Sequence, residues 1–269
     1  MYTFTVRTFL AGLCALIHLS GCATVRQQLG TALISDEAEY ALGEQVAAQI
    51  DSTQKALRMP TVQRYVERVA APLVENALVD RPGVQYRLTV LDDASQINAF
   101  AAPGGFIYVY TGLLIAADDE AELAGVLAHE IGHIVGRHSA NQLASQYGIQ
   151  VLTSIALGQE ADAAAGQIAN IASQLGSARF SRDDERQADR YGVRYTTASG
   201  YDPAGLLSFF EKLKAAEGGR RSSVEKLLSS HPATDDRIRT IQALIERNGT
   251  SGGERNRERF MRETAPLHR

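Results

Sequence analysis

Two stretches near the start of the chain have the spacing of amphipathic helices. Apolar residues recur at four-residue steps from Ser35 to about Leu57, and Ser35 has the hydroxyl preferred at a helix N-cap. A second helix is predicted to open at Pro60, a residue suited to the first helical position, and to reach about Val79. Each predicted helix has one apolar face that it can bury against a core.

The pattern changes to a period of two after Arg81-Pro82-Gly83. Apolar and polar residues alternate from Val84 to Val90, as expected of a half-buried strand. Residues 106–111 form a second strand candidate, set off by Pro103-Gly104-Gly105. The sequence therefore predicts a small sheet between helical segments.

After residue 118 the pattern is helical almost to the end. Asp119 and Glu122 resemble a capping box, and the helix that they open is expected to reach about residue 145. Ser181 is expected to cap a helix that ends near Thr197, and two more helices are expected after residues 203 and 232. Residues 148–178, rich in Ala, Gly, Ile and Leu, indicate either a packed helix or a mobile flap that gates access.

The first 21 residues have the layout of a secretory signal peptide, with one cation, an apolar stretch and a tail of small residues. The tail, Leu19-Ser20-Gly21-Cys22, resembles the lipobox of bacterial lipoproteins, in which the cysteine becomes the acylated first residue. An ordinary signal peptide that contains a cysteine is the alternative. Ala23 is typical of lipoproteins sorted to the outer membrane, if the host is Gram-negative. We therefore expect an outer-membrane lipoprotein that faces the periplasm.

These patterns give the expected domain organisation. We expect a signal peptide at 1–21, a lipidated linker at 22–35, one domain at 36–247 and a flexible tail at 248–269. The net charge of −4 and the lack of a block of Lys or Arg argue against a nucleic-acid partner. We expect the protein to contact the membrane through a lipid anchor at Cys22.

The segment His129-Glu130-Ile131-Gly132-His133 is an HExxH motif within the helix predicted after residue 119. Two histidines four residues apart lie on one helical face and can bind one Zn²⁺, and the glutamate between them can accept a proton from a water that the metal activates. The alternative is a helix with two surface histidines. Apolar residues upstream give this helix a buried face, which favours a zinc site beside the core.

The third ligand decides the class of enzyme. His138 stands nine residues after His129, whereas a metzincin needs a histidine at plus ten, so we expect His138 to be a partly exposed helix residue. Glu185 and Asp189 offer another solution, because they lie one turn apart on the helix predicted after Ser181. Glu185 can ligate zinc while Asp189 orients a ligating histidine ring. The alternative is a solvated acidic face paired with neighbouring arginines.

Four segments together resemble a known family. They are NAFAAPGGFIYVYTGLL from residue 98, DEAELAGVLAHEIGHIVGRHS from residue 119, FSRDDERQADRYG from residue 180 and SSHPATDDRI from residue 229. The combination is similar to the gluzincin zinc metalloendopeptidases of peptidase family M48, the group that includes HtpX, BepA and LoiP. The resemblance spans about residues 36–245 and is nearest to the periplasmic lipoprotein members. It implies an α+β, predominantly helical fold: a single zincin-like metalloprotease domain with a small β-sheet beside the HExxH helix.

The resemblance implies a role for each matching residue. One zinc ion per chain is expected on His129, His133 and Glu185, with Glu130 as general base. Asp189 is expected to contact a ligating histidine ring without binding the metal itself. Three further residues match the stretch beside the cleft where an extended substrate adds as a strand: Asn98, Ala99 and Phe100.

His231 matches the family's His-Pro signature, and three interpretations stay open. It occupies the open position on the metal and latches the enzyme, it stabilises the oxyanion, or it merely caps the last helix. We expect a role near the metal. Arg237 fits the same signature and is expected to pair with an acid near the site.

The resemblance implies a zinc-dependent endopeptidase that cleaves misfolded or stalled envelope proteins in the periplasm. Its partners are expected to be unfolded or misassembled proteins and the outer-membrane protein assembly machinery. The alternative is a latched, chaperone-like assembly factor for outer-membrane proteins with little proteolytic turnover.

Overall fold

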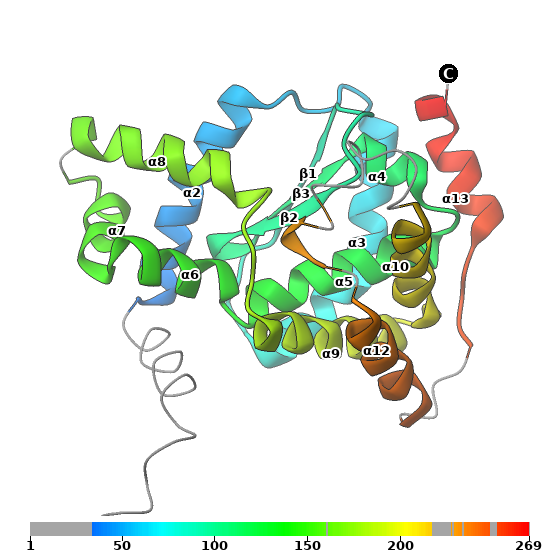
Figure 1. The fold of residues 1–269 in the computed structure, drawn as a ribbon. Coiled ribbons are helices and arrows are strands. Elements are labelled where there is room, and N and C mark those ends of the chain that lie inside the picture. Colours follow the sequence, from blue (N-terminus) through cyan, green and yellow to red (C-terminus); the bar gives the residue numbers. More distant parts are fainter. Residues whose placement is uncertain are drawn as a thin grey trace, which may run out of the picture.

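The computed structural model describes residues 34–159, 161–216, 227, 229–232, 234–247 and 252–268. The predicted signal peptide, Cys22 and nearly all of the predicted linker lie outside the described residues. Figure 1 shows a small sheet at the centre with helices on both of its sides.

The sheet has three strands in the order β1-β3-β2: β1 (Arg87–Leu91), β2 (Ala99–Ala102) and β3 (Phe106–Tyr110). β1 runs parallel to β3, and β2 runs antiparallel to it. A short 3-10 turn, η1 (Pro103–Gly105), joins β2 to β3. Gly105 has φ +107°, and a Cβ there would lie 2.3 Å from the Gln85 carbonyl oxygen, so the turn requires glycine. In the strand order β1-β3-β2, β2 lies at the edge of the sheet.

Each face of the sheet packs against its own hydrophobic core. Ala99 and Ala101 face the first core, whereas Phe100 and Ala102 face the second, as the period of a strand dictates. The first core is built chiefly by α3 (Pro60–Asp80) and α5 (Glu120–Val135), with contributions from further helices that include α9 (Arg182–Ala198). The second is built by α2 (Asp36–Thr53), α6 (His138–Tyr147), α7 (Ile149–Ala156) and α8 (Ala161–Leu175). This mainly helical α+β architecture confirms the predicted fold class.

Several helix starts agree with the predicted capping residues. The Ser35 hydroxyl accepts from the Ala38 N–H at 3.2 Å, and α3 opens at Pro60. The side chains of Asp119 and Ser181 cap α5 and α9 in the same way. The other described α-helices are α4 (Thr111–Ala116), α10 (Ala204–Ala216), α12 (Asp235–Arg247) and α13 (Arg257–Thr264), and a final 3-10 turn, η2, covers Ala265–His268.

The prediction of one helix from residue 119 to about 145 is wrong. α5 ends at Val135, and Arg137 then takes a left-handed conformation with φ +56° before α6 begins at His138. The described part of residues 148–178 contains α7 and α8, whose Ile155 and Ile171 side chains are buried in the second core.

The prediction of a flexible tail from residue 248 is wrong for residues 252–268. They return along the start of α5, where the Glu120 N–H donates to the Arg255 carbonyl at 3.0 Å, and α13 buries Phe260 completely. Residues 257–264 carry no periodic apolar pattern, because α13 is short and polar. Its order comes from tertiary contacts, including an ion pair of Arg259 with the buried Glu120.

Among the described helices, none combines the length and the apolar character needed to cross a bilayer.

Candidate active site

The candidate site lies where α5 and α9 pack closely together. A Cβ at Gly132 would lie 2.9 Å from the Tyr191 Cβ and 3.0 Å from the Ala188 Cα, so glycine at this position of the HExxH motif lets α9 approach. The capping box at Ser181 starts α9 immediately before Glu185. As a result, the first turn of α9 lies against the middle of α5.

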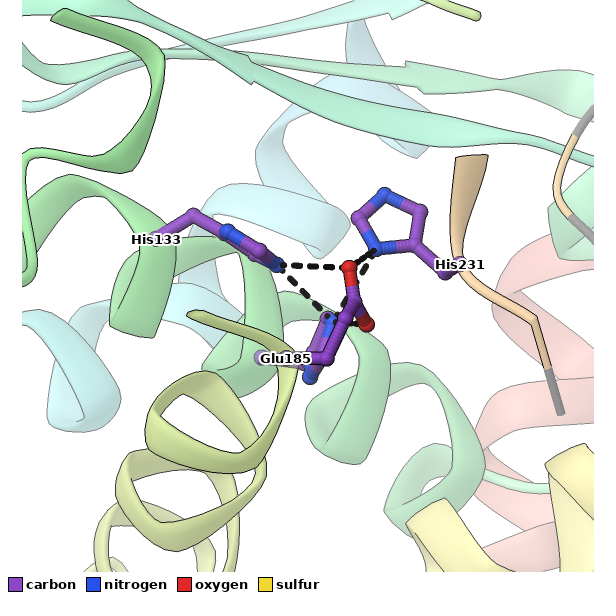
Figure 2. A group of neighbouring side chains, drawn as sticks. His133, Glu185 and His231 are labelled. Atoms are coloured by element: carbon purple, nitrogen blue, oxygen red, sulfur yellow. Dashed lines mark hydrogen bonds and ion pairs between the residues drawn. The ribbon is translucent and has the colours of Figure 1, made fainter. Parts of the chain in front are cut away.

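Four side chains converge at this contact. They are His129, His133, Glu185 and His231, all buried, and each offers one ligand atom within 4.8 Å of the others. The Nε2 atoms of His129 and His133 are 3.1 Å apart. Glu185 Oε2 lies 3.5 Å from His129 Nε2, and Glu185 Oε1 lies 3.7 Å from His133 Nε2. Figure 2 shows the Glu185 carboxylate pointing into the space between the His133 and His231 rings.

His231 lies on the segment that precedes α12, and Figure 2 shows its ring on the other side of the Glu185 carboxylate from His133. Its Nδ1 lies 3.0 Å from Glu185 Oε1 and 3.2 Å from His129 Nε2. Its Nε2 lies 3.6 Å from Glu130 Oε1. His231 therefore contacts both the metal-ligand candidates and the predicted general base.

The donor set fits a divalent cation. Imidazole nitrogens and a carboxylate oxygen in a four-member group are ligands that Zn²⁺ takes in tetrahedral sites. Two neutral imidazoles whose lone pairs face each other at about 3 Å repel unless a proton or a cation lies between them. Neither oxygen of the buried Glu130 carboxylate has a hydrogen-bond partner among the described residues, which leaves both oxygens available to a water or a substrate.

Burial and neighbouring charges set the protonation of the site. Burial lowers the pKa of His129, but the carboxylates of Asp189 and Glu185 outweigh it and raise that pKa to about 9. For His133 burial prevails and places the pKa well below its usual value. The pKa of Glu130 is raised by burial, against the opposing effect of His231 and His129, in the direction that suits a general base near neutral pH.

Asp189 and Arg237 support the group from behind. Asp189 Oδ1 lies 3.1 Å from Nδ1 of His129, the ring nitrogen that faces away from the four-residue group. Arg237 donates to Asp189 through Nε at 2.9 Å and Nη2 at 2.6 Å, and its Nη1 pairs with Glu185 at 2.7 Å. Burial by itself would raise the pKa of Asp189, yet Arg237 and His129 hold it below the usual value. The structure thus pairs Arg237 with two acids at the site.

The three residues predicted beside the cleft lie on or next to the edge strand. Asn98 is fully buried, and its Nδ2 donates to the Gly176 carbonyl at 2.8 Å, in the link between α8 and α9. Ala99 begins β2 on the side of the sheet that faces α5. Phe100 points to the opposite face and stacks on Tyr108, with ring centroids 5.0 Å apart. Phe100 therefore packs in the second core instead of facing the metal group.

Two residues contact the site in ways that the sequence did not predict. His138 was expected to be partly exposed, which is wrong: it is 2% exposed, and its Nδ1 lies 2.9 Å from the His133 Nδ1. Phe180, in the link before α9, stacks on the His133 ring with centroids 4.1 Å apart. Gly136 was the available signal for His138, because glycine near the end of a helical pattern indicates a break.

Comparison with known proteins assigns the family. The sequence profile described as Peptidase family M48 matches residues 56–245, most of the chain and all of the residues in the four-residue group. The chain belongs to peptidase family M48. It is therefore a metalloprotease, and M48 metalloproteases use zinc.

Named relatives of this M48 metalloprotease are similar over most of its length. Metalloprotease LoiP of Escherichia coli K12 is 31% identical over 222 residues, which cover 80% of this chain and 84% of LoiP. Metalloprotease YcaL of the same organism is 30% identical over 218 residues, covering 80% of this chain and 82% of YcaL. The Beta-barrel assembly-enhancing protease of Yersinia pestis is 33% identical over 216 residues, or 77% of this chain. The aligned region is only 44% of that relative, so this chain spans less than half of its length.

Proposed function

We propose that this M48 metalloprotease is an endopeptidase of the bacterial envelope that cleaves misfolded or stalled envelope proteins in the periplasm. The observation that carries the proposal is the buried group of His129, His133 and Glu185 beside the buried carboxylate of Glu130. Two further observations support the location: the segment Leu19-Ser20-Gly21-Cys22, which resembles a lipobox, and a relative named for β-barrel assembly.

In this proposal His129, His133 and Glu185 hold the zinc ion. Zinc, when bound, supplies Lewis acidity, which activates water and polarises the scissile carbonyl. Glu130 accepts the proton of that water and delivers it to the leaving nitrogen, a role that suits its buried carboxylate and raised pKa. Asp189 keeps the His129 ring oriented by accepting from Nδ1, and Arg237 keeps Asp189 ionised.

The substrate is proposed to bind as an extended strand along the outer edge of β2, the edge that faces away from β3. Edge strands present unpaired N–H and C=O groups, and main-chain pairing accepts many sequences, as a protease of unfolded proteins requires. Ala99 is the first candidate for such pairing, because Ala101 already accepts from the Ser139 hydroxyl at 2.9 Å. Asn98 would have to exchange its contact with Gly176 for a contact with the substrate.

His231 distinguishes this proposal from a second candidate function. Its Nδ1 lies as near to Glu185 and His129 as a further metal ligand would, which favours a latched enzyme that acts chiefly as an assembly factor for outer-membrane proteins. Its Nε2 lies on the side of Glu130, which favours an oxyanion donor in an active enzyme. Both functions use the same zinc ligands.

The anchor is proposed to be lipid on Cys22. Such an anchor keeps the protease at the membrane, where it raises the local concentration of protease around assembling proteins. Cys22→Ser should move the protein from the membrane fraction to the soluble fraction, and mass spectrometry of the mature N-terminus should lose the acyl chains. A soluble wild-type protein would contradict the anchor.

The test of the proposed activity is the cleavage of casein, an unfolded protein, by the full chain purified in detergent with zinc. We would compare wild type, Glu130→Gln and His231→Ala, and include a stably folded protein as control substrate. Cleavage of casein that disappears in Glu130→Gln supports the endopeptidase.

The other outcomes separate the two candidates. If wild type is inactive but His231→Ala cleaves casein, the site is latched, and the assembly-factor proposal gains support. If all three proteins bind zinc and none cleaves casein, the endopeptidase proposal fails. In cells, a phenotype that Glu130→Gln leaves intact points to the assembly factor.

A further inference from the structure

His138 is folded back beneath the HExxH helix by the turn that ends α5. Arg137 adopts φ +56°, which reverses the chain before α6. A Cβ at Gly136 would lie 2.3 Å from the Nε2 of His138, so glycine is required for the ring to occupy this place. The His138 side chain is fully buried. The turn thus places a buried imidazole against a candidate zinc ligand.

His133 has a different neighbour at each ring nitrogen. Its Nε2 faces His129 and Glu185 in the four-residue group. Its Nδ1, on the other edge of the ring, lies 2.9 Å from the Nδ1 of His138. The Nε2 of His138 in turn lies 3.0 Å from Oε1 of Gln187 and 3.6 Å from Oδ1 of Asp184, both on α9. These contacts form a line from the metal group through two imidazoles to a side-chain amide.

When His133 binds a metal, the hydrogen bonds along this line can be donated in only one direction, away from the metal. A neutral imidazole that ligates through Nε2 carries its hydrogen on Nδ1 and must donate it. His138 Nδ1 then accepts, so His138 carries its own hydrogen on Nε2. That hydrogen meets the Gln187 carbonyl oxygen, which can only accept.

The reverse direction would block the metal site. If the amide nitrogen of Gln187 faced His138, the hydrogen of His138 would move to Nδ1, and Nδ1 of His133 would have to accept it. The hydrogen of His133 would then lie on Nε2 and point at the position of the metal. His129 has a charged partner in the equivalent place, because its Nδ1 faces the Asp189 carboxylate.

We propose that His138 is a positioning residue, which holds His133 with its hydrogen on Nδ1 and so keeps Nε2 free for zinc, and that Gln187, with the Asp184 carboxylate nearby, fixes the hydrogen of His138 on Nε2. This inference rests on the proposed role of His133 as a zinc ligand. It explains why α5 breaks at Gly136 instead of continuing, since a continuous helix would carry residue 138 away from His133.

The test compares two replacements of His138 in the full chain. His138→Leu removes the acceptor, and His138→Asn places an amide oxygen near the position of Nδ1. Replacing such a supporting partner weakens metal binding about 10- to 100-fold in other zinc proteins. We expect that loss in His138→Leu and recovery of most of it in His138→Asn, measured by competition with a zinc chelator. Gln187→Glu keeps an acceptor oxygen and should stay near wild type. Gln187→Leu should weaken binding, but less than His138→Leu does, because Asp184 remains as an acceptor.

A second measurement reports the hydrogen positions directly. In zinc-free protein with ¹⁵N-labelled histidine, at a pH above the His129 pKa of about 9 so that His129 no longer donates to His133 Nε2, NMR should show His133 with its hydrogen on Nδ1 in wild type and in His138→Asn. It should show the hydrogen on Nε2 in His138→Leu. A purely structural role would lower the melting temperature without moving this hydrogen. If His138→Leu does not fold, His138→Asn and Gln187→Leu carry the test.

The result that overturns the inference is zinc affinity and a His133 hydrogen position that are unchanged in His138→Leu. Equal loss of affinity in His138→Leu and His138→Asn, with both proteins folded, would also overturn it, because packing alone would then explain the loss. A wild-type protein that binds no zinc would instead refute the proposed function, so the two failures are distinguishable.

Discussion

Phe260 of the C-terminal helix α13 packs against Tyr65 of α3, with ring centroids 6.3 Å apart and both side chains almost completely buried. The contact joins residues 195 positions apart in the sequence and belongs to the same core as the HExxH helix. The C-terminal segment, which lies beyond the region matched by the family profile, is thus part of the folded domain.

We predict that Phe260→Ala destabilises the domain. Removing a buried phenylalanine ring leaves a cavity, and the free energy of unfolding should fall by about 3–5 kcal/mol. The matched control is Met261→Ala, since Met261 is the next residue and is 44% exposed; it should change the free energy by less than about 0.5 kcal/mol. Urea unfolding of both variants measures the difference. Equal effects would show that α13 does not pack as described.

The proposed zinc ligands predict different metal contents for two variants. Glu185→Ala removes a ligand and should reduce bound zinc well below one ion per chain. Glu130→Gln removes the general base but no ligand, so its zinc content should remain near that of wild type. Elemental analysis after dialysis measures both. Equal zinc in the two variants would refute the assignment of Glu185.

Arg237 is predicted to stabilise the folded domain, because it pairs with two buried acids. Arg237→Leu leaves Asp189 without its guanidinium partner in a buried environment, and breaking such a pair costs about 3–5 kcal/mol. Arg239→Leu, two residues away on α12, is the control, because Arg239 is 70% exposed. Urea unfolding of the zinc-free proteins makes the comparison. A small effect of Arg237→Leu would mean that Asp189 finds another partner or takes up a proton.

The link between α8 and α9 is predicted to restrict access to the site. Arg179 Nε donates to the Ser229 carbonyl at 2.8 Å, which ties the link to the segment that carries His231. Arg179→Ala should loosen both segments and raise the kcat/KM for casein. Arg182→Ala, at an exposed position just beyond the link, should leave it unchanged. If Arg179→Ala lowers kcat/KM while the fold is intact, the link assists substrate binding instead.

Local sequence signals determined most of the helices and the centre of the site. Side-chain caps at Ser35, Asp119 and Ser181 act within one turn, so the helix starts were predictable. The HExxH spacing likewise depends only on helix geometry, which puts His129 and His133 on one face. The assignment of Glu185 as a ligand depends on a second helix, and it was made through the family's motifs.

Tertiary structure decided the features that depend on contacts distant in sequence. The order of α13 comes from Phe260 and from the ion pair of Glu120 with Arg259, partners that no local pattern reveals. The burial of His138 follows from the turn at Gly136 and the approach of α9, and the edge position of β2 follows from sheet pairing. The sequence by itself determined which groups can bind a metal, because ligand chemistry and helical period are local. Only the packing of α5 and α9 determined which ring nitrogen faces the metal group and which faces a supporting side chain.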